Sequence, residues 1–111
     1  MQQILVYSDS LSWGIVPTTR KRLPFDARWP GVMEIALTEQ RHRVRVIEDC
    51  LNGRRTVIAC EIDCHFFDAG SVTPASAVDG IHLDADQHQR LGRSLAAFVA
   101  GLPGFSPSIA R

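Results

Sequence analysis

Two short apolar segments separated by a helical pattern open the chain, and this order predicts an α/β domain. Residues 4–7 form a continuous apolar run followed by polar residues, which is typical of a strand buried on both faces. Residues 30–40 begin with proline and carry apolar residues at helical spacing, and residues 43–47 alternate polar and apolar positions. Strand, helix and strand in this order predict a parallel pair with a right-handed crossover.

The second half of the chain contains one clear helix. Asp84 and Gln87 have the spacing of a capping box, and an apolar stripe follows them until Gly101. Residues 18–28 show neither the helical nor the strand period of hydrophobic positions, and their basic and proline residues predict a surface loop.

Residues 65–67 are a candidate for a third, very short strand, whereas residues 57–64 show no pattern. We expect one domain over residues 1–102, followed by a flexible tail over residues 103–111 that is rich in proline and glycine.

Composition and charge exclude several classes of protein. The 111 residues are 45% hydrophobic and 22% charged, which excludes a disordered, collagen-like or coiled-coil chain. The 12 basic residues balance the 12 acidic ones, so no field gathers nucleic acid or an anionic membrane surface. No apolar run approaches the roughly 20 residues that span a bilayer, and the first residues lack a secretory signal. We expect a cytoplasmic protein.

Ser10 is a candidate nucleophile, because it follows a predicted buried strand and ligands gather at the carboxyl ends of parallel strands. A serine nucleophile needs a base and an acid that orients the base. In the segment Asp79-Gly80-Ile81-His82, a tight turn can bring the carboxylate onto one imidazole nitrogen and leave the other nitrogen for the serine proton. Each segment alone is more often a solvated loop or a turn before a helix, so neither segment indicates a catalytic site by itself.

Five segments of the chain also match, in order, the motifs of a known hydrolase family. They are residues 4–14, 28–32, 46–56, 66–72 and 79–82. On these segments the chain resembles the SGNH/GDSL-type serine hydrolases, specifically their arylesterase and acyltransferase branch. The resemblance implies a three-layer, flavodoxin-like α/β fold. It also implies a serine ester hydrolase that acts on a small ester or aryl ester through an acyl-enzyme, without a cofactor or metal.

The resemblance assigns roles to particular residues. It implies Ser10 as the nucleophile, Asp79 and His82 as its catalytic partners, and the backbone N–H groups of Ser10 and Gly53 as oxyanion donors. Two further residues are candidates for substrate binding, Trp13 and Asn52. Trp13 and Trp29 are both candidates for an acyl pocket, with packing in the core as the alternative.

Two departures from the family pattern bear on activity. Ser8 stands where the family has a glycine, and no Gly-x-Asn-Asp segment is present, since Asn52 is the only asparagine. We therefore expect a shortened sheet of about three parallel strands. Removing two strands shifts the loop that carries the base by roughly 10 Å, because strands lie about 4.8 Å apart. This shift is expected to break the triad unless the loops or a second chain compensate.

The shortened sheet leaves a second reading of the function open. The chain is then an inactive, internally deleted hydrolase remnant or an oligomeric binding module. Uncovered apolar surface and unpaired strand edges predict a dimer, a domain-swapped homo-oligomer or low stability.

Cysteine and histidine residues offer a weaker alternative chemistry. Cys60, Cys64 and His65, with Cys50 nearby in the sequence, lack the paired short motifs of structural zinc sites. Three cysteines also cannot all pair with one another, so reduced thiols are the simpler reading. His42 and His88 lie among polar residues, and we expect both to be solvated.

Overall fold

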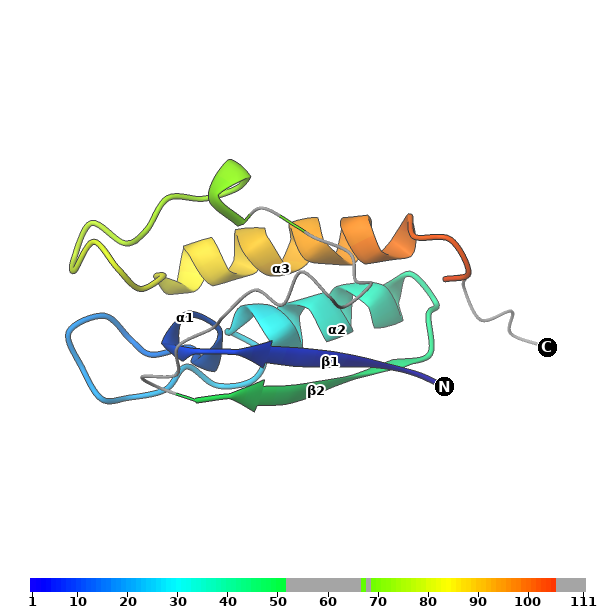
Figure 1. The fold of residues 1–111 in the computed structure, drawn as a ribbon, viewed down its shortest axis with the longest axis horizontal. Helices are drawn as coiled ribbons and strands as arrows, with labels where there is room; N and C mark the ends of the chain where they lie inside the picture. The colour runs from blue at the N-terminus through cyan, green and yellow to red at the C-terminus, as the bar shows by residue number, and fades with distance from the viewer. Residues whose placement is uncertain (52–66, 68, 106–111) are drawn as a thin grey trace, which may run out of the picture.

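A computed structural model describes residues 1–51, 67 and 69–105, and within them a parallel strand pair packs against one helix, on which a second helix packs. Strand β1 (Gln2–Ser8) pairs with β2 (Val44–Cys50), from Gln2 opposite Val44 to Ser8 opposite Cys50. Helix α2 (Trp29–Glu39) lies against the strands, and α3 (Ala85–Ala100) runs along α2 (Figure 1). The predicted α/β class and the parallel strand–helix–strand unit are confirmed.

Two of the about three expected strands lie within the described residues, where they form a parallel pair. Of the third predicted strand, residues 65 and 66 lie outside the described part. Phe67 is not in a strand, and its ring packs edge-on against Phe98 of α3 with centroids 5.2 Å apart.

The expectation that the first strand is buried on both faces was wrong. Val6 points inward and is 7% exposed, but its neighbours Leu5 and Tyr7 are 64% and 62% exposed. Successive side chains of a strand point to opposite faces. Helix α2 packs on one face only, so the apolar run is buried at alternate positions in the described part of the molecule.

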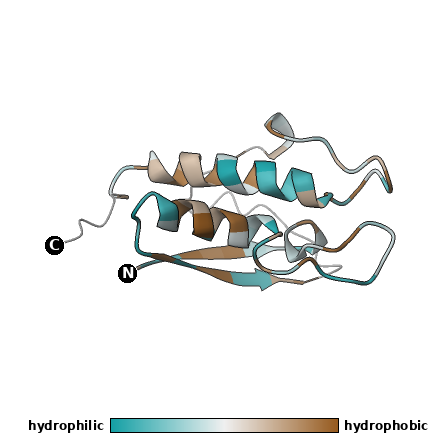
Figure 2. Cartoon of the chain, turned by 180° about the vertical axis from the view of Figure 1, so that it is seen from behind, coloured by the Kyte–Doolittle hydropathy of each residue, from teal (hydrophilic) through white to brown (hydrophobic). Residues whose placement is uncertain are grey.

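The core forms where α2 meets the strands. Figure 2 shows α2 and much of both strands in hydrophobic colours, while the first half of α3 is hydrophilic. Met33 and Leu37 of α2 are almost completely buried and contact inward-facing residues of both strands. Pro30 stands in the first turn of α2, where its missing N–H costs no helical hydrogen bond. None of the helices in the described part is long and apolar enough to cross a membrane.

Helices α2 and α3 approach each other closely at Gly92. A Cβ atom at Gly92 would lie 2.6 Å from Val32 Cβ and 2.8 Å from the Trp29 carbonyl oxygen. The absence of a side chain therefore allows the two backbones to meet. The predicted capping box is present at the start of α3, with Asp84 and Gln87 each bonding the backbone of the other.

The expectation that His42 and His88 are solvated was wrong. His88 is 1% exposed and accepts a hydrogen bond at Nδ1 from the Trp29 N–H, at 3.0 Å. His42 is 4% exposed, and its ring lies 4.6 Å from the ring of Phe105. Polar neighbours in the sequence point to other faces, so they do not keep these rings in water. Phe105 itself packs against the core, whereas residues 106–111 of the predicted tail lie outside the described part.

Candidate active site

Ser10 begins a one-turn helix directly after the first strand. Strand β1 ends at Ser8, and Asp9 caps α1 (Ser10–Trp13) by accepting a hydrogen bond from the Leu11 N–H at 3.0 Å. The hydrophobic pattern of the sequence does not predict this short helix. An aspartate directly before the serine is the signal that could have found it, since aspartate is a favoured helix N-cap.

The candidate acid and base lie on a tight turn just before α3. Gly80 has a φ of +69°, a conformation that residues with a Cβ rarely adopt. The turn lets Asp79 Oδ1 accept the N–H groups of Ile81 and His82, both at 2.9 Å. Asp79 Oδ2 lies 2.7 Å from His82 Nδ1. Backbone bonding from Ile81, together with the His82 side chain and N–H, lowers the pKa of Asp79 from 3.8 to about 2.

The charge of Asp79 determines the tautomer of His82. A carboxylate with such a low pKa is ionised near neutral pH and only accepts hydrogen bonds. His82 Nδ1 therefore carries the proton that points to Asp79. In the neutral ring, Nε2 is then an acceptor. It lies 3.2 Å from Ser10 Oγ, so the serine hydroxyl can donate to it.

The shortened sheet predicts a broken triad unless the loops or a second chain compensate, and within this one chain the contacts are intact. Ser10, His82 and Asp79 form one chain of hydrogen-bonding distances although the described sheet has two strands. That expectation places the histidine loop by counting strands. In the structure the loop is placed by α3, which begins at Ala85 and packs directly on α2 at Gly92.

Five solved structures resemble this chain in fold. The inhibitor-bound aryl esterase of M. smegmatis is 19% identical, with a TM-score of 0.79 over 92% of this chain and 100% of that chain. The native form of that enzyme is also 19% identical, with a TM-score of 0.78 and the same coverage. A carbohydrate acetylesterase from Sinorhizobium meliloti is 17% identical, with a TM-score of 0.76 over 90% of this chain and 99% of that chain. This chain has the fold of these esterases.

Neither a family model nor a curated protein sequence matches the chain. Similarity to the esterases is therefore visible in the three-dimensional structure at sequence identities of 17–22%. In the esterase fold adopted here, the ends of β1 and β2 lie at one edge of the sheet, where Ser10 follows β1.

The other predicted site residues have different outcomes. No described residue accepts a hydrogen bond from the Ser10 N–H, so this group is available to an oxyanion. Gly53 and Asn52 lie outside the described residues. Trp13 packs against the core, and the Arg22 guanidinium lies 4.9 Å from the centroid of its ring. Its role in substrate binding stays a prediction.

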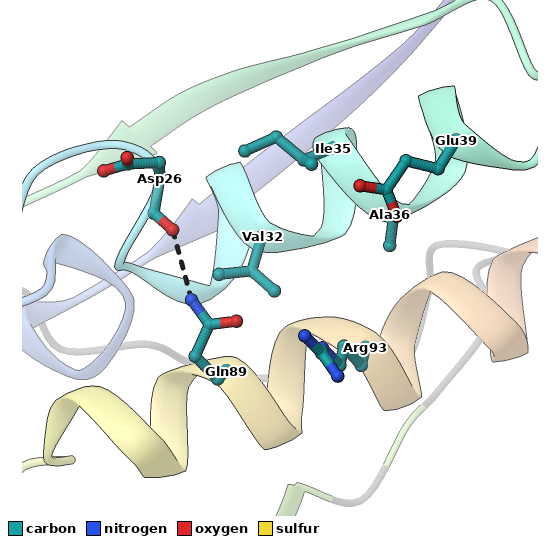
Figure 3. Close-up of a pocket in the computed structure, with 7 residues that line it drawn as sticks. All are labelled: Asp26, Val32, Ile35, Ala36, Glu39, Gln89 and Arg93. Atoms are coloured by element: carbon teal, nitrogen blue, oxygen red, sulfur yellow. Dashed lines mark hydrogen bonds between the residues drawn. The ribbon is translucent and has the colours of Figure 1, made fainter.

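Two hollows in the described part of the surface lie beside the strands and helices of the site. The larger has a volume of about 860 Å³ and is lined by β1, α3 and residues that flank the triad, including Asp9, Leu11 and Ile81. The smaller, of about 80 Å³, lies between α2 and α3, where Gln89 Nε2 donates to the Asp26 carbonyl oxygen at 3.2 Å (Figure 3). No triad residue lines the smaller hollow.

The alternative metal chemistry receives no support from the part of the chain that the structure describes. Within those residues, no group of three or more histidine, cysteine or acidic side chains is arranged to hold a metal ion. Cys60, Cys64 and His65 lie outside the described part. Cys50 is buried, and its thiol lies 3.6 Å from the Val6 carbonyl oxygen.

Proposed function

We propose that this chain is a serine ester hydrolase that acts through an acyl-enzyme on Ser10. The observation that carries the proposal is the continuous contact from Ser10 Oγ through His82 to Asp79, at 3.2 and 2.7 Å. A nucleophile within reach of a base, with the base oriented by a third group, is the arrangement that activates a serine hydroxyl. The structural likeness to aryl and carbohydrate esterases favours an ester as the substrate.

Acylation follows from this geometry. Ser10 Oγ attacks the carbonyl carbon of the ester while its proton moves to His82 Nε2. Asp79 stabilises the imidazolium that forms, because its carboxylate stays ionised and bonded to Nδ1. The tetrahedral intermediate collapses when His82 gives the proton to the leaving oxygen. The C–O bond of the ester breaks, and the alcohol or phenol departs.

Deacylation uses the same groups in reverse. Water attacks the acyl carbon and gives its proton to His82 Nε2. The bond to Ser10 Oγ then breaks, Ser10 recovers the proton, and a carboxylic acid leaves. The Ser10 N–H donates to the oxyanion in both halves of the reaction, with the Gly53 N–H proposed as a second donor. No step requires a cofactor. We propose small esters, including aryl esters, as substrates.

Hydrolysis of p-nitrophenyl acetate tests the proposal. Wild-type protein is expected to release nitrophenol with saturation kinetics and to carry one acetyl group on Ser10 when the reaction is quenched. Ser10→Ala is expected to fall to the background rate. Ser94→Ala, which removes a hydroxyl from α3, is the matched control and is expected to retain wild-type activity. Equal rates for wild type and Ser10→Ala refute the proposal.

One observation favours a second candidate, a non-catalytic homo-oligomer. Leu5 and Tyr7 expose most of their side chains on neighbouring positions of β1, and Ile81 beside the triad is 64% exposed. Exposed apolar side chains close together favour association. Light scattering after size-exclusion chromatography distinguishes the readings. A dimer that lacks Ser10-dependent turnover supports the second candidate, and an active monomer excludes it.

A further inference from the structure

Trp29 touches both halves of the candidate site, although it belongs to neither. It is the first residue of α2, between the helix that begins with Ser10 and the helix that follows His82. From the sequence, Trp29 is a candidate for an acyl pocket or for packing in the core. In the structure, the side chain of Trp29 forms a hydrogen bond with Ser12, and its backbone N–H forms one with His88.

The side chain of Trp29 is bonded to the nucleophile's helix. Trp29 Nε1–H donates to Ser12 Oγ at 3.1 Å, and the Ser12 hydroxyl donates to Ser8 Oγ at 2.9 Å. Ser12 is 6% exposed, so water is largely excluded from this contact. Ser8 is the last residue of β1, and Ser12 shares the one-turn helix α1 with Ser10. The turn that carries the nucleophile is thus fixed on its buried side.

The backbone of Trp29 is bonded to the base's helix. Its N–H donates to His88 Nδ1 at 3.0 Å, and His88 is 1% exposed. The first N–H groups of a helix have no partner inside that helix. No side chain of the preceding residues caps α2, so this donor is satisfied from α3 instead. His88 lies six residues after His82, in the first half of α3.

We propose that Trp29 is a positioning residue that fixes the turn of Ser10 and the helix behind His82 relative to each other. This inference rests on the proposed esterase function. The geometry that it protects is the 3.2 Å contact between Ser10 Oγ and His82 Nε2. A displacement of about 1 Å between reacting groups costs on the order of a hundredfold in rate. Among the described residues, the hydrogen bonds of Trp29 reach Ser12, on the helix of Ser10, and His88, on the helix after His82. Trp29 therefore acts on the chemical step through these helices and not by touching the reacting atoms.

Removal of the indole donor tests the proposal. Trp29→Phe keeps an aromatic ring but loses Nε1–H, and Ser12→Ala loses the acceptor. Each is expected to lower kcat about tenfold to a hundredfold with KM changed less than about threefold, because orientation is lost and binding is kept. The double variant is expected to be no slower than the slower single variant, because both changes break one contact. Thr38→Val removes a hydrogen bond at the far end of α2 and is the matched control, with unchanged kcat.

A spectroscopic readout separates this inference from the esterase proposal. The NMR signals of the His82 ring report its contact with Ser10 whether or not turnover occurs. We expect these signals to shift in Trp29→Phe and in Ser12→Ala alike, and to stay unchanged in Thr38→Val. Absence of Ser10-dependent turnover in wild type refutes the esterase alone. Unchanged His82 signals in both variants, or single effects on kcat that multiply in the double variant, overturn the positioning role.

Discussion

Adding one methyl group at Gly92 tests whether the packing of α3 on α2 holds His82 in place. In Gly92→Ala the new Cβ would meet Val32 Cβ at 2.6 Å and the Trp29 carbonyl oxygen at 2.8 Å. Carbon atoms in contact settle at about 3.5–4.0 Å, so the helices must separate by roughly 1 Å at this point. Neither neighbour yields easily, because Val32 is buried with a stiff β-branched side chain and the Trp29 oxygen belongs to the backbone.

The separation has two measurable consequences. Overpacking costs about 1–3 kcal/mol, and the better helix propensity of alanine offsets about 1 kcal/mol of it, so a net loss of about 1 kcal/mol is expected in urea unfolding. The larger effect is on catalysis. A displacement of α3 lengthens the contact between Ser10 and His82 from 3.2 Å toward 4 Å, which is beyond hydrogen-bond distance, and is expected to lower kcat about a hundredfold.

Gly101→Ala is the matched control on the same chain. A Cβ there would meet its nearest atom at 3.6 Å, an ordinary contact, so wild-type kcat and stability are expected. The assay is initial-rate hydrolysis of p-nitrophenyl acetate together with urea unfolding for both variants. Wild-type kcat in Gly92→Ala would refute the reasoning, since it would mean that the base is positioned by something other than this helix contact.

Three other variants test the chemistry and its support. Burial, and secondarily Arg28, lower the pKa of His88 from 6.5 to about 4. The unfolded chain therefore gains a proton first on acidification. The free energy of unfolding is expected to be highest above about pH 6.5 and to fall by on the order of 3 kcal/mol toward pH 4, a loss that urea titrations should not find in His88→Asn. Asp79→Asn removes the acceptor that fixes the tautomer of His82, and steady-state assays are expected to show kcat reduced about 10³- to 10⁴-fold with little change in KM. Arg28→Lys loses the two-pronged contact with Glu48, whose bonds are both 2.8 Å, and is expected to lower the free energy of unfolding by about 2 kcal/mol.

Much of the described fold follows from local patterns in the sequence. The helix after residue 29 and the strand after residue 43 are visible as a change of hydrophobic period, and the capping pair Asp84 and Gln87 marks the start of α3 within one residue. These features depend on neighbours in the sequence, which is why one chain suffices to predict them. The turn at Asp79 is of the same kind, because its hydrogen bonds join residues two and three positions apart.

The features that the sequence does not predict depend on contacts between distant segments. His88 is read as solvated because its sequence neighbours are polar, yet it lies three and seven residues before Leu91 and Leu95. At this helical spacing all three share the inward face of α3. That spacing is the signal that could have found it. Its partner, the Trp29 N–H, lies 59 residues away and has no counterpart in local pattern.

The triad geometry shows why counting strands is a poor guide to the position of the base. The spacing of strands predicts the position of a loop only when a strand holds that loop in place. Here two residues separate His82 from α3, and α3 is held against α2 by the approach at Gly92 and the bond from Trp29 to His88. In the described part of the chain, the contacts between the two helices therefore help to set the position of the base relative to the nucleophile.

Alignment of the triad does not by itself stabilise the oxyanion of the transition state. The chain has no Gly-x-Asn-Asp segment to supply an asparagine donor to the oxyanion. Loss of one such donor costs about 10²- to 10³-fold in rate, or about 3–4 kcal/mol of transition-state binding. Because Ser10 and His82 keep their contact, the missing oxyanion donor is expected to lower kcat. The reaction is still expected to require Ser10. The proposed esterase activity is thus expected to be slow but strictly dependent on Ser10. If Ser10→Ala keeps the same slow rate as wild type, the slow rate does not come from an aligned triad that lacks one oxyanion donor, and this argument is contradicted.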